Sequence, residues 1–129
     1  MSQKQIIASE KAPKALGPYS VANRFENLVF TAGQLGLDPQ TNELAPGGIE
    51  AETRQALTNI KYVLEAAGSS MDQVLKTTVF LRDMNDFARM NAVYGQFFNG
   101  NYPARSTVQV AALPKGGAVE IEVIACLAS

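Results

Sequence analysis

The chain contains no histidine and no tryptophan, and its only cysteine is Cys126. Without histidine, a Ser-His-Asp nucleophilic site and most transition-metal sites are excluded. Neither of the two common glycine-rich phosphate loops is present. Cys126 cannot form a disulfide within the chain and lies in an apolar strand pattern, so we interpret it as a structural thiol. Any chemistry must therefore use arginine, carboxylates, tyrosine, hydroxyl groups, backbone groups and water.

Charge is scarce as well. Charged residues make up 18% of the chain, below the roughly 25% that is usual for globular domains. Eleven basic and 12 acidic residues leave a net charge of -1. The chain therefore lacks the excess of positive charge that is typical of proteins that bind the phosphates of nucleic acid. With 47% hydrophobic residues and so little charge, we expect part of the surface to be hidden in an oligomer.

Long hydrophobic runs are missing too. No run approaches the ~20 residues that a membrane helix needs, and the segment from Met1 to Lys11 is too polar for a signal peptide. We therefore expect a cytoplasmic protein that does not contact a membrane. The length of 129 residues predicts one domain, residues 1–129, which can bury a core without disulfides.

The periodicities predict a mixed order of elements, β-β-β-α-β-α-β-β. Apolar residues recur every three or four positions from Ile49 to Ala67 and indicate a helix that Gly68 ends. An aromatic stripe predicts a second helix over 85–98. Alternation and β-branched residues predict strands at 4–7, after a turn at 15–20, and at 28–34, 74–81, 105–111 and 119–126. The run 74–81 is so apolar that we expect it to be buried on both faces.

The last two strands each alternate between an apolar and a polar row. In the first, Val108 and Val110 are expected to face the core, opposite a row of Arg105, Thr107 and Gln109. In the second, Glu120 and Glu122 face away from an apolar row. Arg105 is then either a solvated charge or a clamp for a carboxylate, because its planar fork can donate two parallel hydrogen bonds. Glu120 could orient a water molecule or carry a proton.

Geometry limits how these two residues can act together. If 105–111 and 119–126 formed a tight hairpin, Arg105 would lie opposite the region of Cys126 and about 20 Å from Glu120. One site that uses both residues requires that the strands are not hairpin neighbours, or that a second subunit supplies one of them.

Six short motifs in order along the chain resemble those of the RidA family, also called YjgF. They are Ala15-Leu16-Gly17-Pro18-Tyr19-Ser20, Thr31-Ala32-Gly33-Gln34, Lys76-Thr77-Thr78-Val79-Phe80-Leu81-Arg82-Asp83-Met84, Asn91-Ala92-Val93-Tyr94, Pro103-Ala104-Arg105-Ser106 and Glu120-Ile121-Glu122. The resemblance covers nearly the whole chain. It implies a chorismate-mutase-like α/β (α+β) fold, in which two helices pack on one face of a mixed sheet and the last core strand lies between the first and second.

The resemblance also implies an assembly and an activity. The assembly is a homotrimer whose sheets face a shared centre, with a ligand cleft between neighbouring subunits. The activity is hydrolysis of reactive enamines and imines, such as 2-iminobutanoate and 2-iminopropanoate, to 2-oxo acids and ammonia, without a metal or an organic cofactor. A non-catalytic trimer that binds small carboxylates in the same cleft is the alternative. RNA binding or cleavage, which has been attached to relatives of the family, is disfavoured by the net charge.

Carried over residue by residue, the family's site falls on eight positions. Arg105 would hold the substrate carboxylate, Glu120 would position the attacking water, and Tyr19 would close over the substrate. Gly33 would offer backbone contacts, and Phe87 and Asn91 would complete the wall. Two positions depart from the commonest pattern: Thr107 stands where many members have cysteine, and Ala32 stands where they often have serine. Both departures bear on substrate preference and rate.

Overall fold

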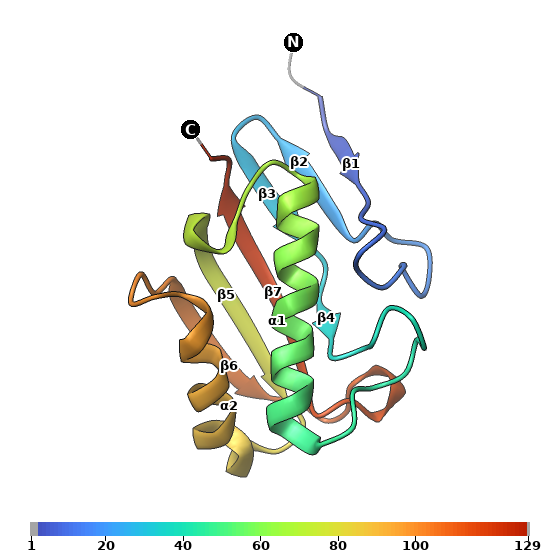
Figure 1. The fold of residues 1–129 in the computed structure, drawn as a ribbon, viewed down its shortest axis with the longest axis vertical. Helices are drawn as coiled ribbons and strands as arrows, with labels where there is room; N and C mark the ends of the chain where they lie inside the picture. Colours follow the sequence, from blue (N-terminus) through green and yellow to red (C-terminus); the bar gives the residue numbers. More distant parts are fainter. Residues whose placement is uncertain (1–2, 129) are drawn as a thin grey trace.

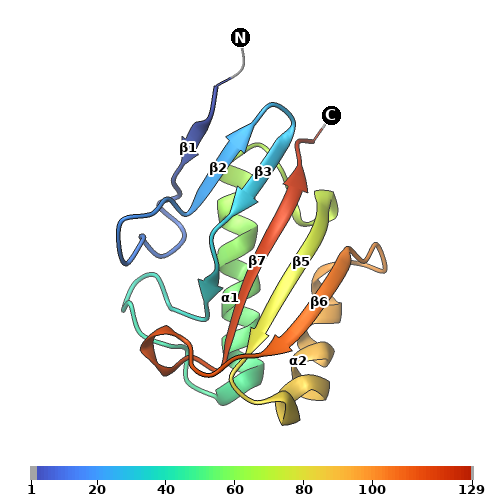
Figure 2. The ribbon, with the colours of Figure 1, turned by 180° about the vertical axis from the view of Figure 1, so that it is seen from behind.

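The computed structural model describes residues 3–128, which form one mixed sheet with two α-helices on one of its faces (Figures 1 and 2). The strands are β1 (Gln5–Ile7), β2 (Ala22–Phe25), β3 (Leu28–Thr31), β4 (Gln34–Leu35), β5 (Val74–Leu81), β6 (Ala104–Gln109) and β7 (Val119–Cys126). The helices are α1 (Gly48–Ala66) and α2 (Phe87–Tyr94). The fold therefore confirms the predicted arrangement of two helices on one face of a mixed sheet.

Helix α1 lies within one residue of its predicted bounds. Its apolar stripe is buried against the sheet, with Leu57, Ile60 and Leu64 fully inaccessible to solvent. Gly68 has φ 87°, a left-handed conformation that glycine adopts without steric cost, and it stands just past the helix end as predicted.

Helix α2 is shorter than the predicted span of 85–98. It is flanked by two 3₁₀ turns, η2 (Met84–Asp86) and η3 (Gly95–Phe97). The carboxylate of Asp83 accepts a hydrogen bond from the backbone N–H of Asn85 at 2.9 Å, which caps the first turn. Tyr94 and Phe98 of the aromatic stripe are nonetheless buried, because the tighter turn still directs Phe98 into the core, whereas Phe87 is 38% exposed.

The strand order is β1-β2-β3-β7-β5-β6, with β4 pairing to β7. Strand β7 is antiparallel to both β3 and β5, and β6 is parallel to β5. The segments 105–111 and 119–126 are therefore not hairpin neighbours, as the family resemblance implied. However, the first two strands of the chain pair directly with each other, and β7 lies between β3 and β5.

Two expectations about the strand faces were wrong. Strand β5 is buried on one face only: Val79 and Leu81 lie against the helices, whereas Leu75 is 49% exposed. In β6, Val108 does not reach the core and is 43% exposed. It lies on the face that neither helix covers, which we call the open face, whereas Arg105 shares the helix-bearing face with Thr77, its partner in β5.

The predicted strand at 28–34 is interrupted. Strand β3 ends at Thr31, and β4, which sequence periodicity did not reveal, begins at Gln34. Ala32 and Gly33 lie in the break. This interruption matters for the site, because Gly33 lies beside β7 at the position of Glu120.

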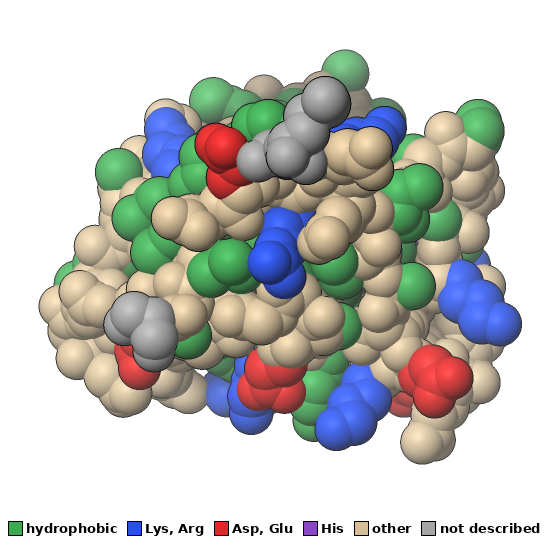
Figure 3. Space-filling model, turned by 90° about the horizontal axis from the view of Figure 1, so that it is seen from above, with side chains coloured by type: hydrophobic (Ala, Val, Ile, Leu, Met, Phe, Trp, Pro, Cys, Tyr) green, Lys and Arg blue, Asp and Glu red, His purple; other side chains and the backbone are tan. Residues whose placement is uncertain are grey.

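The two sides of the sheet differ in surface character. Viewed from the end where the termini lie, charged side chains gather along the lower edge of Figure 3, the α1 side, whereas hydrophobic side chains predominate along the upper edge. Large exposed hydrophobic residues on the open face include Ile6, Phe25, Leu28, Phe30 and Val108. No helix within residues 3–128 combines the length and apolar character needed to cross a membrane.

Candidate active site

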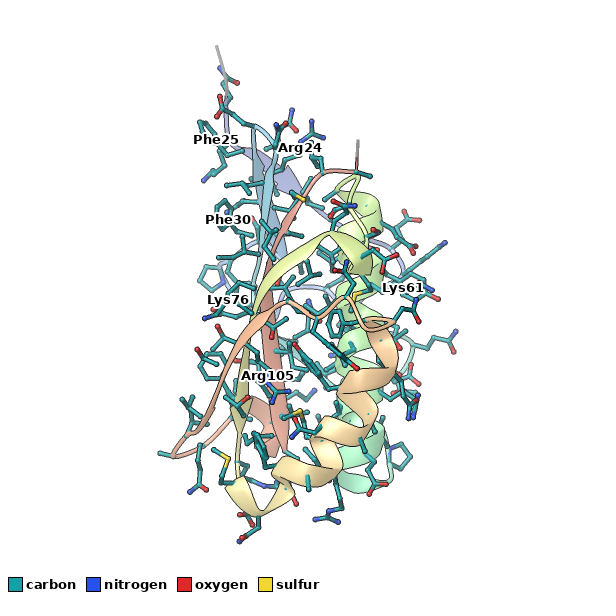
Figure 4. All side chains as sticks on the ribbon, turned by 90° about the vertical axis from the view of Figure 1, so that its left-hand side faces the viewer. Arg24, Phe25, Phe30, Lys61, Lys76 and Arg105 are labelled. Atoms are coloured by element: carbon teal, nitrogen blue, oxygen red, sulfur yellow. The ribbon has the colours of Figure 1, made fainter. Side chains whose placement is uncertain are left out.

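Arg105 lies on β6, the edge strand of the sheet, and its side chain extends toward α2 (Figure 4). Its guanidinium carbon is 4.7 Å from the ring centroid of Tyr94 and 5.5 Å from that of Phe87. Among residues 3–128, no carboxylate lies within ion-pair distance of Arg105. The guanidinium is therefore held by aromatic faces, and its charge is not neutralised by an acidic side chain.

A pocket of about 460 Å³ opens beside this arginine, lined by Asn91, Tyr94, Gly95, Tyr102, Pro103 and Arg105. Two buried side-chain oxygens on this side of the sheet have no hydrogen-bond partner among residues 3–128: Oδ1 of Asn91, which lines the pocket, and Oγ1 of Thr107. Thr107 is two residues from Arg105 on the same face of β6. Buried polar atoms are normally paired, so two unpaired oxygens on the side of the sheet that carries Arg105, which has no acidic partner among the described residues, indicate a place for a polar ligand.

Glu120 lies on β7, on the open face, and lines a second pocket of about 240 Å³. Tyr19, Gly33 and Pro114 line the same pocket. A Cβ atom added to Gly33 would lie 2.6 Å from the carboxyl carbon Cδ of Glu120, a distance that real Cβ atoms do not adopt. The absence of a side chain at Gly33 therefore makes room for the Glu120 carboxyl group.

The environment of Glu120 favours its protonated form. Partial burial raises its pKa above the ordinary value of 4.5, and the negative charge of Glu122, two residues along the same face of β7, raises it further. A carboxylate whose pKa is raised toward neutrality is better suited to exchange protons with a water molecule at physiological pH.

Tyr19 and Ala32 lie on the Glu120 side of the molecule. The hydroxyl oxygen of Tyr19 accepts a hydrogen bond from the backbone N–H of Leu16 at 3.0 Å, and its side chain is 48% exposed. The ring is thus fixed on its own turn at the rim of the pocket. Ala32 is half-buried, and its backbone N–H donates to the carbonyl oxygen of Val21 at 2.9 Å.

The eight predicted residues consequently form two groups. Arg105, Phe87, Asn91 and Thr107 lie on the helix-bearing side, and Glu120, Gly33 and Tyr19 line the other pocket. Ala32 precedes Gly33 in the chain but does not line that pocket. Arg105 of β6 pairs with Thr77 of β5, and Thr77 pairs in turn with Val123 of β7. Val123 is three residues along β7 from Glu120. Two strand spacings and three residues along a strand separate the Cα atoms of Arg105 and Glu120 by about 14 Å. Their side chains also point to opposite faces of the sheet.

Sequence reasoning placed Tyr94 only in the apolar stripe of its helix and did not connect it with Arg105. Lys14, which lines the Glu120 pocket, was also missed. Neither residue carries a local signal, because both positions depend on how distant segments pack. Within residues 3–128, no group of three or more cysteine or acidic side chains is arranged to hold a metal ion.

Comparison with known proteins agrees with this architecture. A family model described as Endoribonuclease L-PSP matches residues 9–127. The Bos taurus protein named 2-iminobutanoate/2-iminopropanoate deaminase is 52% identical over 122 residues, which are 95% of this chain and 89% of that protein. The structure of RidA from an Antarctic Psychrobacter has a TM-score of 0.92 and 50% identity, over 95% of this chain and 99% of that chain.

A further solved structure, E. coli TdcF with bound serine, has a TM-score of 0.91 and 45% identity, over 96% of this chain and 99% of that chain. The sheet order and the helices on one face are thus those of the YjgF/L-PSP fold. The chain belongs to the endoribonuclease L-PSP family, that is, to the RidA (YjgF) proteins that its motifs resemble.

Proposed function

We propose that this protein hydrolyses 2-imino acids such as 2-iminobutanoate and 2-iminopropanoate, together with their enamine tautomers. Water adds to the C=N carbon, the C–N bond then breaks, and a 2-oxo acid and ammonia leave. The observation that carries the proposal is the identity of about half of all positions, along nearly the whole chain, to proteins named for this activity. The two pockets contain groups suited to the reaction.

Arg105 binds the carboxylate that all these substrates share. A charge-assisted hydrogen bond contributes roughly 1.5 to 3 kcal/mol, and the guanidinium fork can form two in parallel. The orphaned oxygen of Asn91 can accept a hydrogen bond from the substrate nitrogen, and Phe87 packs against the apolar part. This geometry holds the electrophilic carbon in one place relative to the rest of the site.

Glu120 orients the attacking water and accepts its proton, and it then returns a proton to the leaving nitrogen. Gly33 lets the carboxyl group and the substrate approach its backbone closely. Tyr19 covers the substrate from the rim of the pocket. An imine is already electrophilic, so a fixed carboxylate and an oriented water supply most of what the reaction needs.

A neighbouring subunit brings the two pockets together. Arg105 and Glu120 of one chain point to opposite faces of the sheet, so one chain alone cannot place both on a small substrate. The open face also carries five large exposed hydrophobic residues, including Phe25 and Phe30, which extend away from the helices in Figure 4. Phe25, Leu28 and Phe30 lie on the paired strands β2 and β3, and exposed apolar side chains gathered in this way are typical of a subunit interface. We therefore propose a homotrimer with its sites between neighbouring subunits.

The two departures from the family pattern tune this site. Thr107 retains a hydroxyl group, and its unpaired oxygen lies on the face of β6 that carries Arg105. It can therefore replace the contact that a cysteine would make. Ala32 offers no side-chain donor, so any ligand contact there comes from its backbone. We expect both residues to affect rate and substrate preference more than the reaction itself.

The activity is tested by release of 2-oxobutanoate or ammonia from 2-iminobutanoate generated in the assay by a second enzyme. The wild-type protein should accelerate release over the spontaneous rate, and Arg105→Ala should abolish the acceleration while retaining the oligomeric state. No acceleration with either 2-iminobutanoate or 2-iminopropanoate would contradict the proposed activity for these substrates.

A second candidate is a binding protein for small carboxylates that uses the same cleft without turnover. The structure of a relative with bound serine favours it. Glu120→Gln separates the two candidates, because it abolishes turnover but keeps binding in an enzyme, and changes little in a binding protein. RNA cleavage, which the family description names, is not proposed, because the chain has a net charge of -1 and no histidine.

A further inference from the structure

Arg105 is held in an unusual way for a residue that binds an anion. Its neighbours on α2 are two aromatic rings, and no acidic side chain among the described residues pairs with it. An ion pair would occupy the N–H groups that a substrate carboxylate needs. Stacking uses the flat face of the guanidinium instead, so that the N–H donors not used in the contact with the Tyr94 hydroxyl stay available in its plane.

The two rings differ in how firmly they are fixed. Phe87 is 38% exposed at the first turn of α2, whereas Tyr94 is 5% exposed. The Tyr94 ring also packs against Phe98, with their centroids 4.8 Å apart. Tyr94 is therefore the rigid member of the pair, and it is also the nearer one to the guanidinium carbon.

A hydrogen bond inside the core ties Tyr94 to the sheet. Its hydroxyl oxygen is 2.8 Å from Oγ1 of Thr77, a residue with no solvent exposure. Thr77 is the register partner of Arg105 across the parallel β5–β6 pair. Arg105, Tyr94 and Thr77 thus form one closed unit, in which a strand carries the arginine and its neighbouring strand anchors the ring that stacks on it.

Burial also keeps this anchor in one protonation state. It raises the pKa of the Tyr94 hydroxyl above 10.0, although the hydrogen bond to Thr77, the charge of Arg105 and a hydrogen bond with Arg105 act in the opposite direction. The hydroxyl therefore remains protonated at neutral pH and can act as the donor to Thr77.

We propose that Tyr94 is a positioning residue for Arg105, and that its hydrogen bond to Thr77 fixes the ring against which the guanidinium is oriented toward the substrate carboxylate. The inference rests on the proposed carboxylate-binding role of Arg105. Tyr94 itself does not react. Loss of its ring lets the guanidinium rotate among several rotamers, so carboxylate binding weakens while the hydrolytic step at Glu120 is unaffected.

The test measures the dissociation constant of 2-oxobutanoate by calorimetry, together with KM and kcat for the imine. Tyr94→Leu should weaken binding about 5- to 30-fold, the range that loss of a cation–π contact gives, and KM should rise in parallel with little change in kcat. Tyr94→Phe keeps the ring and should weaken binding less than Tyr94→Leu. Phe97→Leu is the matched control, because it removes another aromatic ring that packs against the core beside the same helix and leaves Phe98 and the two rings beside Arg105 in place.

A double-mutant cycle distinguishes positioning from general destabilisation. In the Arg105→Ala background, Tyr94→Leu should weaken binding no further, because no guanidinium remains to be oriented. Equal effects in both backgrounds would overturn the inference, and so would wild-type affinity in Tyr94→Leu or equal losses in Phe97→Leu. Wild-type affinity in Tyr94→Phe would overturn the part assigned to the Thr77 hydrogen bond.

Binding of 2-oxobutanoate also distinguishes failure of the proposed reaction from failure of the inference about Tyr94. If the wild-type protein binds 2-oxobutanoate but does not accelerate imine hydrolysis, the proposed reaction is wrong and the binding cycle still decides the role of Tyr94. If the wild-type protein does not bind 2-oxobutanoate, the carboxylate clamp is wrong and the inference is overturned with it.

Discussion

Strands β6 and β7 have the same alternating pattern of polar and apolar residues, but they present it in opposite ways. In β7 the apolar row faces the helices and Glu120 lies on the open face. In β6 the polar row faces the helices, and Val108 is exposed on the open face. Alternation shows that a strand has two different faces, but pairing with β5 decides which face meets the core.

This difference explains why the two charged residues are held so differently. Arg105 lies in the shallow space between an edge strand and a short helix, where aromatic rings can stack on it. Glu120 lies on a central strand beside a glycine and a second carboxylate, where its pKa is raised. In the proposed function the Arg105 half of the site binds the substrate and the Glu120 half exchanges protons, so each half can be changed separately.

The largest effect is expected from the proton-exchanging half. Glu120→Gln keeps the size of the side chain but removes its basicity, and it should lower kcat by about 10² to 10⁴, the usual contribution of general acid–base catalysis. Binding of 2-oxobutanoate should be retained. Glu122→Gln, on the same face, should retain most of the turnover. Comparable losses of kcat in the two variants would contradict the assignment.

The next effect tests the glycine beside that carboxylate. Gly33→Ala places a Cβ 2.6 Å from Cδ of Glu120, so the carboxyl group must move. Because small displacements of a catalytic group are costly, we expect kcat to fall about 10- to 100-fold while the melting temperature changes little. A Gly33→Ala variant with wild-type kcat would show that the close approach has no catalytic role.

A smaller effect is expected in the binding half. Arg105→Lys keeps the charge but loses the planar fork and the stack on Tyr94, so KM should rise about tenfold with kcat nearly unchanged. Arg89→Lys, at an exposed ion pair on the other side of α2, serves as the control and should leave KM unchanged. A fall in kcat with an unchanged KM would place Arg105 in the chemical step instead.

The smallest effect concerns pH. Glu120 acts as a carboxylate, so activity should fall as pH drops through its raised pKa. Glu122→Gln removes the neighbouring negative charge, which lowers the pKa of Glu120 and should move the acid limb of the kcat/KM profile to lower pH. A limb that stays in place, or moves to higher pH, would contradict the assignment of that limb to Glu120.

Much of the fold could be predicted because local patterns determine it. Strands β5 and β7 and helix α1 have bounds close to those expected, since each carries a long periodic signal. Strand β4 was missed because two residues carry no period, and α2 was overextended because its aromatic stripe continues into a 3₁₀ turn. The burial of Val108 was predicted wrongly because the face that a strand presents depends on long-range pairing.

The candidate site was predicted only in part for the same reason. Family motifs pointed to Arg105 and Glu120 as candidates, and the argument from strand spacing required either that the two strands are not hairpin neighbours, as the structure shows, or that a second subunit supplies one of the residues. Tyr94 could not be assigned a role, since its contact with Arg105 arises from the packing of α2 on a parallel strand pair. Nothing in the spacing of residues along the chain encodes that contact.

The most direct test of the account is to mix two inactive variants. Arg105→Ala and Glu120→Gln chains, unfolded and refolded together, should recover activity, because a site between subunits can take its arginine from one chain and its carboxylate from the other. With random mixing in a closed ring, about a quarter of the sites should be intact, and neither variant refolded alone should recover. Mixed oligomers that form but remain inactive would contradict the claim that each site is shared between two subunits.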